Sequence, residues 1–232
     1  MSHIHFPDGV IPGVWWIPGY IAALAAIFLI TKLTKAEEAR RKIPFAGMGG
    51  ALMLIAMSVP LGFIPLHFSM AVLTGIVVGP GLGFIIVFVV NLILAFLGHG
   101  GFTVVGLNTL LMGAEVFVGV SVFRLLAARF HPVPRAVLAA AAAIFVSVAL
   151  MIGLVTAAVG PEAVYHHGHH EFHWSALTGW SALFALLLVG IVLEAAVTGA
   201  VIGYILKVRP RLIESSQRII SRKEEDYEAG TD

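Results

Sequence analysis

The sequence predicts an all-α integral membrane protein with about seven transmembrane helices. Composition is the first reason: 59% of the 232 residues are hydrophobic and 12% are charged, whereas soluble domains carry about 25% charged residues. A chain with so few charges cannot cover a water-facing surface, and most of its exterior must therefore face lipid. Length is the second reason, because each span needs about 20 apolar residues and the chain has room for roughly six to eight of them.

The predicted spans are apolar stretches separated by short polar or Gly-Pro segments. In chain order they cover residues 14–33, 43–61, 65–79, 81–97, 103–126, 136–159 and 175–206. Trp15, Trp16 and Tyr20 lie near the start of the first span, where aromatic side chains favour the membrane interface. We therefore expect one transmembrane helical domain with a metal-binding N-terminus over residues 1–207, and a charged cytoplasmic tail over residues 208–232.

The basic residues predict the orientation of the chain. All 14 Lys and Arg lie in three segments, residues 32–42, 124–135 and 207–223. Seven spans place these segments on one side of the membrane, and the positive-inside rule makes that side the cytoplasm. We expect the first segment to be a charged loop between the first two spans. The N-terminus is then outside and the tail is inside.

The histidines show the opposite asymmetry, because all of the ten except His131 fall on the outer side. They are His3, His5, His67, His99 and five within the His-rich loop, residues 165–173. Imidazole suits nickel, cobalt, copper and zinc, and with no cysteine a metal must be bound through nitrogen or oxygen. The spacing in the His-rich loop defines no closed site, so this loop is either a loose metal-collecting surface or an ordinary solvated loop.

The N-terminus offers a second kind of donor set. A free amine, a deprotonated backbone amide and a nearby imidazole form fused chelate rings, which favour square-planar Ni²⁺ or Cu²⁺. If Met1 is removed, Ser2 and His3 supply these donors and leave one position for a histidine such as His67. If Met1 stays, Met1, Ser2 and His3 fill four positions alone. In the absence of a metal, His3 and His5 are ordinary polar residues of the interface.

Two carboxyl side chains interrupt the apolar spans, Glu115 in the fifth and Glu194 in the seventh. A carboxyl at membrane depth is costly, and neither residue has a basic partner at helical spacing. We expect each to be protonated, to pair across helices with Asn91, Asn108 or Thr198, or to touch a partner protein. Polar contact between helices is the favoured interpretation, and an ion path through the bundle is the alternative.

Several catalytic motifs are missing from the sequence. It contains no Walker A lysine loop, so the chain does not hydrolyse ATP itself, and it contains neither His-Glu-x-x-His nor Gly-x-Ser-x-Gly. An intramembrane metalloenzyme would need an outer metal with an open position and a base such as Asp8 or Glu171, but no motif supports it. We therefore expect a protein that is not an enzyme. No basic-aromatic cluster suggests nucleic acid as a partner.

Four ordered motifs resemble the CbiM/NikM family, the substrate-specific membrane subunits of energy-coupling factor (ECF) ABC transporters for cobalt and nickel. His5-Phe6-Pro7-Asp8-Gly9 is similar to the family's opening His-Ile-Pro-Asp-Gly. The later motifs are His67 with Ala71-Val72-Leu73 and Gly79-Pro80, then Gly98-His99-Gly100-Gly101-Phe102-Thr103 with Gly106, Asn108 and Met112-Gly113, and finally Glu194-Ala195-Ala196-Val197-Thr198-Gly199. The resemblance runs through most of the chain.

The resemblance implies seven helices, an extracellular N-terminus inserted into the bundle, and a metal bound by N-terminal nitrogens and His67. The candidate ligands are Ser2, His3, His5, His67 and His99. The family motif aligns with His5, but three extra residues separate it from Met1, so the amine cannot chelate with it through one shared amide. Either His3 with a processed Ser2 takes this role, or His5 binds as a plain imidazole. His99 replaces an acidic residue of the family and either adds a ligand or lines the entrance.

The function implied is capture of Co²⁺ or Ni²⁺ from the outside for ATP-driven uptake through a prokaryotic cell membrane. The metal is transported cargo, and no permanent cofactor is expected. The implied partners are the lipid bilayer, a transmembrane coupling subunit and two cytoplasmic ATPase subunits, and a small accessory membrane subunit is common in the family. Spans one and two, rich in Gly and Ala, are the expected contact surfaces. The alternative is a stand-alone divalent-metal channel or secondary carrier.

Overall fold

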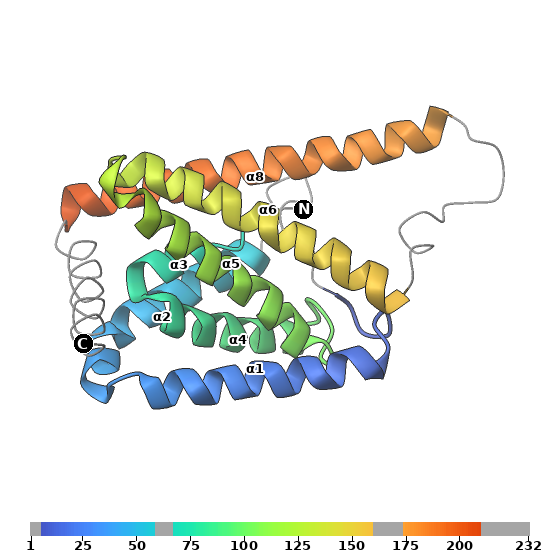
Figure 1. Ribbon diagram of the computed structural model, residues 1–232, viewed down its shortest axis with the longest axis horizontal. Coiled ribbons are helices and arrows are strands. Elements are labelled where there is room, and N and C mark those ends of the chain that lie inside the picture. The colour runs from blue at the N-terminus through green and yellow to red at the C-terminus, as the bar shows by residue number, and fades with distance from the viewer. Residues whose placement is uncertain (1–5, 59–66, 160–173, 210–232) are drawn as a thin grey trace, which may run out of the picture.

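The computed structural model describes residues 6–58, 67–159 and 174–209 (Figure 1). The elements in these ranges are α1 (Gly13–Leu33), α2 (Ala36–Ser58), α3 (Ala71–Val78), α4 (Pro80–Phe96), α5 (Val105–Leu125), the 3₁₀ turn η1 (Leu126–Ala128), α6 (Pro132–Val159) and α8 (Trp174–Val208). No strand occurs in the described ranges. Four helices, α1, α5 with η1, α6 and α8, are long and apolar enough to cross a membrane. The predicted all-α membrane fold is confirmed.

Two predicted helix starts were wrong because polar residues were interpreted as loops. The charged loop expected over residues 32–42 is much shorter. Residues 36–42 form the first turns of α2, so only Thr34 and Lys35 connect α1 to α2. Ala, Glu, Arg and Lys are strong helix formers, and Arg41 donates a hydrogen bond to Glu37 one turn earlier at 3.1 Å. The sixth predicted span likewise begins at Pro132, because proline favours the first turn of a helix.

The third predicted span is much shorter than expected. Residues 67–70 are not helical, and α3 has only 8 residues, which span about 12 Å of a hydrocarbon core about 30 Å thick. Met70 adopts a left-handed conformation with φ of 53°, and Gly79 ends the helix with φ of 97°. Non-helical backbone at this depth is tolerated only when protein surrounds it, and α3 packs against α2, α4 and α5.

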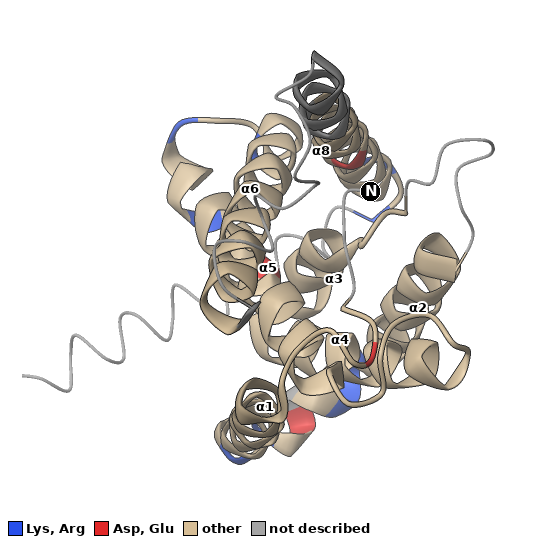
Figure 2. Ribbon diagram, turned by 90° about the vertical axis from the view of Figure 1, so that its right-hand side faces the viewer, with Lys and Arg blue, Asp and Glu red and all other residues tan. Residues whose placement is uncertain are grey.

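Helix α5 lies at the centre of the bundle. It packs against α1, α3, α4 and α6, and Figure 2 shows α3, α4 and α5 in the interior with α1, α2, α6 and α8 around them. The contact with α1 is close because Gly106 faces Gly19: a Cβ at position 106 would stand 2.6 Å from the Tyr20 Cα atom. Glycine is therefore required at the crossing of α1 and α5.

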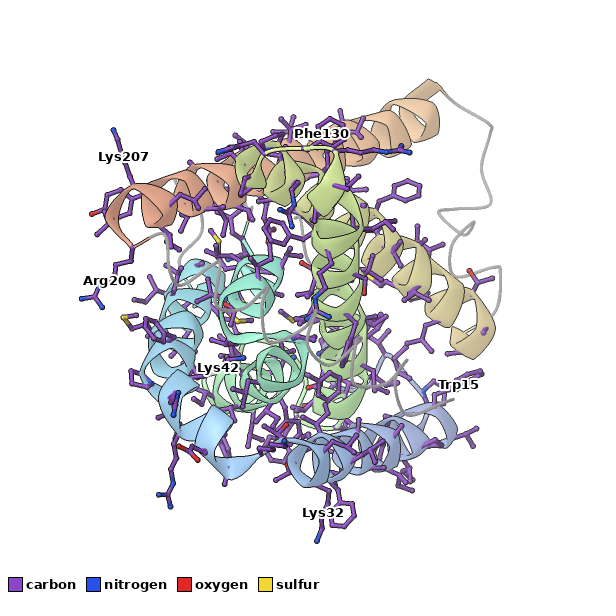
Figure 3. All side chains as sticks on the ribbon, turned by 60° about the vertical axis from the view of Figure 1, so that its left-hand side comes forward. Trp15, Lys32, Lys42, Phe130, Lys207 and Arg209 are labelled. Carbon is purple, nitrogen blue, oxygen red and sulfur yellow. The ribbon has the colours of Figure 1, made fainter. Side chains whose placement is uncertain are left out.

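The described basic residues gather at one end of the bundle. The end of α1, the start of α2, the turn between α5 and α6 and the end of α8 share the left side of Figure 1. Figure 3 shows Lys207 and Arg209 there and Trp15 on the opposite side. Buried Arg135 donates to the Phe123 carbonyl oxygen from Nε at 2.9 Å and from Nη2 at 2.7 Å, which caps the end of α5. This separation of charge is what the positive-inside prediction requires.

Candidate metal centre

The backbone of Phe6 is fixed against the first turn of α5. Its N–H donates to Asn108 Oδ1 at 3.1 Å, and its carbonyl oxygen accepts from Gly101 N at 2.9 Å. The Phe6 side chain is buried in a small apolar cluster with Ile11, Val104 and Leu107. Because His5 is bonded directly to Phe6, the chain toward the N-terminus leaves from a defined point beside the loop of residues 98–104.

Asp8 makes a second connection to the same loop. Its Oδ1 accepts from the Thr103 backbone N–H at 2.8 Å and from the Thr103 hydroxyl at 2.6 Å, while Oδ2 accepts from Phe102 N at 3.0 Å. The hydrogen bonds from Thr103 lower the pKa of Asp8. Gly101 permits the close approach, because a Cβ there would stand 2.7 Å from the Pro7 carbonyl carbon. This carboxylate is therefore occupied in holding the N-terminal segment, not placed as a catalytic base.

Two of the five predicted metal ligands meet at this place. The rings of His67 and His99 are nearly perpendicular, with their centroids 5.6 Å apart. Metal–imidazole bonds of about 2.0–2.1 Å allow two rings to share one ion when their centroids are within about 6 Å. His67 is partly buried and His99 is exposed. The loop that binds Phe6 also brings His99 against His67.

The surroundings of His67 suit a metal ligand. The side chain is partly buried, and a hydrogen bond to the Met57 backbone ties its ring to the end of α2. A histidine that donates one ring N–H to a carbonyl presents the lone pair of its other nitrogen in a fixed direction. Burial, geometry and hydrogen bonding therefore all suit a ligand.

The other predicted ligands, Ser2, His3 and His5, lie outside the described residues, as does the His-rich loop over residues 165–173. Within the described ranges no group of three or more His, Cys, Asp or Glu side chains is placed to hold a metal ion. His67 and His99 thus supply two donors, and further ligands would have to come from another part of the chain.

The Ser69 cluster, defined as Ser69, Glu115 and Glu194, was not predicted. Ser69 Oγ lies 2.7 Å from Glu115 Oε1 and 2.5 Å from Glu194 Oε1, and Glu194 Oε1 also accepts from the backbone N–H groups of Ser69 and Met70, each at 3.0 Å. The expected polar contact between elements is confirmed, but with a serine as the partner. These hydrogen bonds connect Ser69, which lies two residues after His67, to helices α5 and α8.

Two of the three expected partners have hydrogen bonds to other groups, and the third, Thr198, is buried. Asn108 binds the Phe6 backbone, and Asn91 Nδ2 lies 3.4 Å from Thr109 Oγ1 between α4 and α5. The sequence held one weak signal for the role of Asn108, because it belongs to the motif that follows His99. It held none for Ser69, whose partners are 46 and 125 residues away.

Comparison with known proteins identifies relatives of the whole bundle. The chain matches the CbiM family, described as the cobalt uptake substrate-specific transmembrane region, over residues 5–212. Two crystal structures, of a transition metal transporter and of a truncated transition metal transporter, share the fold with a TM-score of 0.69 at 21% sequence identity. The matches cover 93% and 88% of this chain, respectively, and 99% of the other chain in each case. The comparison with curated proteins found no match.

Proposed function

This chain belongs to the CbiM family of cobalt uptake substrate-specific transmembrane proteins, and on that premise we propose that it captures Co²⁺ or Ni²⁺ from the outside as the substrate-binding subunit of an ATP-driven uptake system. The observation that carries the proposal is the 5.6 Å pairing of His67 with His99 beside the point where Phe6 is fixed. An N-terminal segment that starts there can reach a metal held by these two imidazoles.

The ligand set fits a late first-row divalent ion. His67, with His3 or His5 and N-terminal nitrogens, supplies the nitrogen donors that Ni²⁺ and Co²⁺ accept. His99 is a further donor on the exposed side of the site. The contacts of Phe6 and Asp8 with the loop over residues 98–104 hold residues 6–8 beside the loop that carries His99. The choice between the two metals depends on coordination geometry rather than on residue type.

Energy for uptake comes from partner proteins in this proposal. The sequence has no Walker A loop, so ATP hydrolysis belongs to two cytoplasmic ATPase subunits that act through a transmembrane coupling subunit. Exposed apolar side chains of α1 and α2 face either lipid or that subunit: Val14, Ile21, Phe28, Met48 and Ile55. Metal release requires a lower affinity in a second conformation, since a ligand shifts two states only by its differential affinity for them.

An uptake assay separates this function from the stand-alone carrier. The chain is reconstituted in vesicles, with its coupling and ATPase subunits or alone, and the accumulation of Ni²⁺ or Co²⁺ is followed. We expect accumulation only with the partner subunits and ATP. Equal uptake by the chain alone would contradict the proposal and favour a channel or carrier.

A further inference from the structure

The peptide group between Phe102 and Thr103 is held at both of its ends. The Tyr20 hydroxyl donates a hydrogen bond to the Phe102 carbonyl oxygen, and the Thr103 N–H donates to Asp8 Oδ1 at 2.8 Å. The Phe102 ring also packs edge-on against Phe96 at the end of α4, with the ring centroids 5.2 Å apart. Tyr20 belongs to α1 and Asp8 to the segment before it. This one peptide group therefore connects both to the loop over residues 98–104.

His99 lies in the same loop, between two glycines. Its backbone N–H donates to the Leu94 carbonyl oxygen at 2.8 Å, which fixes this residue to the end of α4. Gly98 and Gly100 have φ values of 77° and 95°, and glycine restricts the path of the backbone less than other residues do. The direction of the His99 side chain therefore also depends on where the loop is held on its other side, at residues 101–103.

The position of Tyr20 follows from the close crossing of α1 and α5. A Cβ on Gly19 would stand 2.6 Å from the Leu107 Cδ2 atom, and one on Gly106 would stand 2.6 Å from the Tyr20 Cα atom. The Tyr20 ring is partly buried and packs edge-on against Trp16, with the centroids 6.4 Å apart. The helix crossing and Trp16 thus fix the ring whose hydroxyl reaches the loop.

We propose that Tyr20 is a positioning residue for the candidate metal centre. Its hydroxyl holds the loop over residues 98–104 so that the His99 ring stays beside His67, at the observed 5.6 Å between centroids. Tyr20 acts through His99 and does not bind the ion. A loop that is already ordered favours binding, because the ion does not have to order it on arrival. This inference rests on the metal-capture function proposed above.

A role in helix packing alone is the competing explanation for the Tyr20 hydroxyl. Such a role would change the stability of the bundle and leave the metal centre unaltered. Positioning differs in a measurable way, because its effect on metal affinity requires the imidazole that is being positioned. A double-mutant cycle with His99 measures this dependence.

The experiment compares wild type, Tyr20→Phe, His99→Ala and the double variant, each as the full chain in detergent. Tyr204→Phe is the matched control, because it removes the same hydroxyl from a tyrosine of α8 that is 68% exposed. Titration with Ni²⁺ gives the dissociation constant of each protein. Hydrogen exchange of the metal-free proteins, read by mass spectrometry, reports the order of the loop over residues 98–104.

We expect Tyr20→Phe to weaken Ni²⁺ binding by about 3- to 10-fold, the effect of one lost hydrogen bond. Exchange should become faster in the loop over residues 98–104 and stay unchanged in the centre of α5. In the His99→Ala background the same substitution should change the affinity by less than about 2-fold, since the ring that it positions is gone. Tyr204→Phe should alter neither measurement.

Unchanged Ni²⁺ affinity in Tyr20→Phe would overturn the proposal. An equal loss of affinity with and without the His99 imidazole would overturn it as well, because Tyr20 would then act by another route. If His99→Ala binds too little Ni²⁺ for the cycle, exchange decides: faster exchange confined to the loop supports positioning, and faster exchange throughout the chain refutes it. If the wild type binds no Ni²⁺, the proposed function fails, while exchange of the metal-free protein still shows whether Tyr20 holds the loop.

Discussion

At the scale of single residues, Asp8 fixes the start of the chain beside the candidate metal centre. Its pKa is lowered by the hydrogen bonds from the Thr103 hydroxyl and backbone and from Phe102. A carboxyl whose pKa is lowered in the folded state stabilises the fold above its unfolded pKa of about 3.9. That contribution is lost as the pH falls through the lower folded-state value. The hydrogen bonds that Asp8 accepts from Thr103 and Phe102 therefore contribute their full stabilisation at neutral pH.

Replacing Asp8 by Asn should loosen the loop that carries His99. The amide oxygen of asparagine lacks the charge that strengthens the hydrogen bonds from Phe102 N and Thr103 N. We expect faster hydrogen exchange at these two amides at neutral pH, measured by mass spectrometry. Glu37→Gln, which neutralises an exposed carboxylate at the other end of the bundle, is the control. Identical exchange in Asp8→Asn and wild type would show that Asp8 does not hold the loop.

The residue types in the sequence indicated part of the candidate site. The rest depends on contacts between residues that are far apart in the sequence. His67 and His99 were candidates because imidazole binds transition metals, but nothing in the sequence shows that their rings meet. Their contact depends on the path of residues 98–104, which follows from the hydrogen bonds to Phe6 and Asp8. Ser69 could not be predicted, because a serine gains its role from two carboxyl groups on distant helices.

At the scale of elements, the apolar stretches predicted α1, α4, α5 and α8 well, and α6 except for its start, because the thickness of the bilayer dictates the length of an apolar helix. The same argument failed for α3. This helix is buried among other helices, so its length does not have to match the thickness of the bilayer. It failed for the start of α2, where polar residues continue the helix into solvent. Hydropathy thus locates long apolar helices better than a short buried helix or a helix that begins with charged residues.

The crossing of α1 and α5 gives a prediction about helix packing. In Gly106→Ala the added Cβ would lie 2.6 Å from the Tyr20 backbone, and backbone atoms cannot rotate away. We expect a loss of about 1–3 kcal/mol in stability, the usual cost of overpacking, measured by thermal unfolding in detergent. Gly47→Ala is the matched control in α2, since its Cβ would meet nothing within 4 Å. Equal melting temperatures for the two variants would contradict the close crossing.

At the scale of the whole molecule, the two ends of the bundle differ in chemistry, and this predicts the orientation. The chain has no cysteine, so Val10→Cys and Phe130→Cys each introduce a single thiol. These positions have similar exposed fractions, 45% and 46%, one near the candidate metal centre and one in the turn between η1 and α6. A membrane-impermeant maleimide applied to intact cells should label Val10→Cys alone. The reverse pattern would contradict an outer metal site.

Metal binding by purified protein tests the central claim most directly. The full chain is loaded with Ni²⁺ or Co²⁺, freed of excess metal, and analysed for bound metal per protein, with His67→Ala and His131→Ala beside the wild type. His131 is an exposed histidine at the basic end. We predict nearly stoichiometric metal in wild type and His131→Ala, and its loss in His67→Ala. Metal retained by His67→Ala would contradict the account and move the site to the N-terminal residues alone or to the His-rich loop.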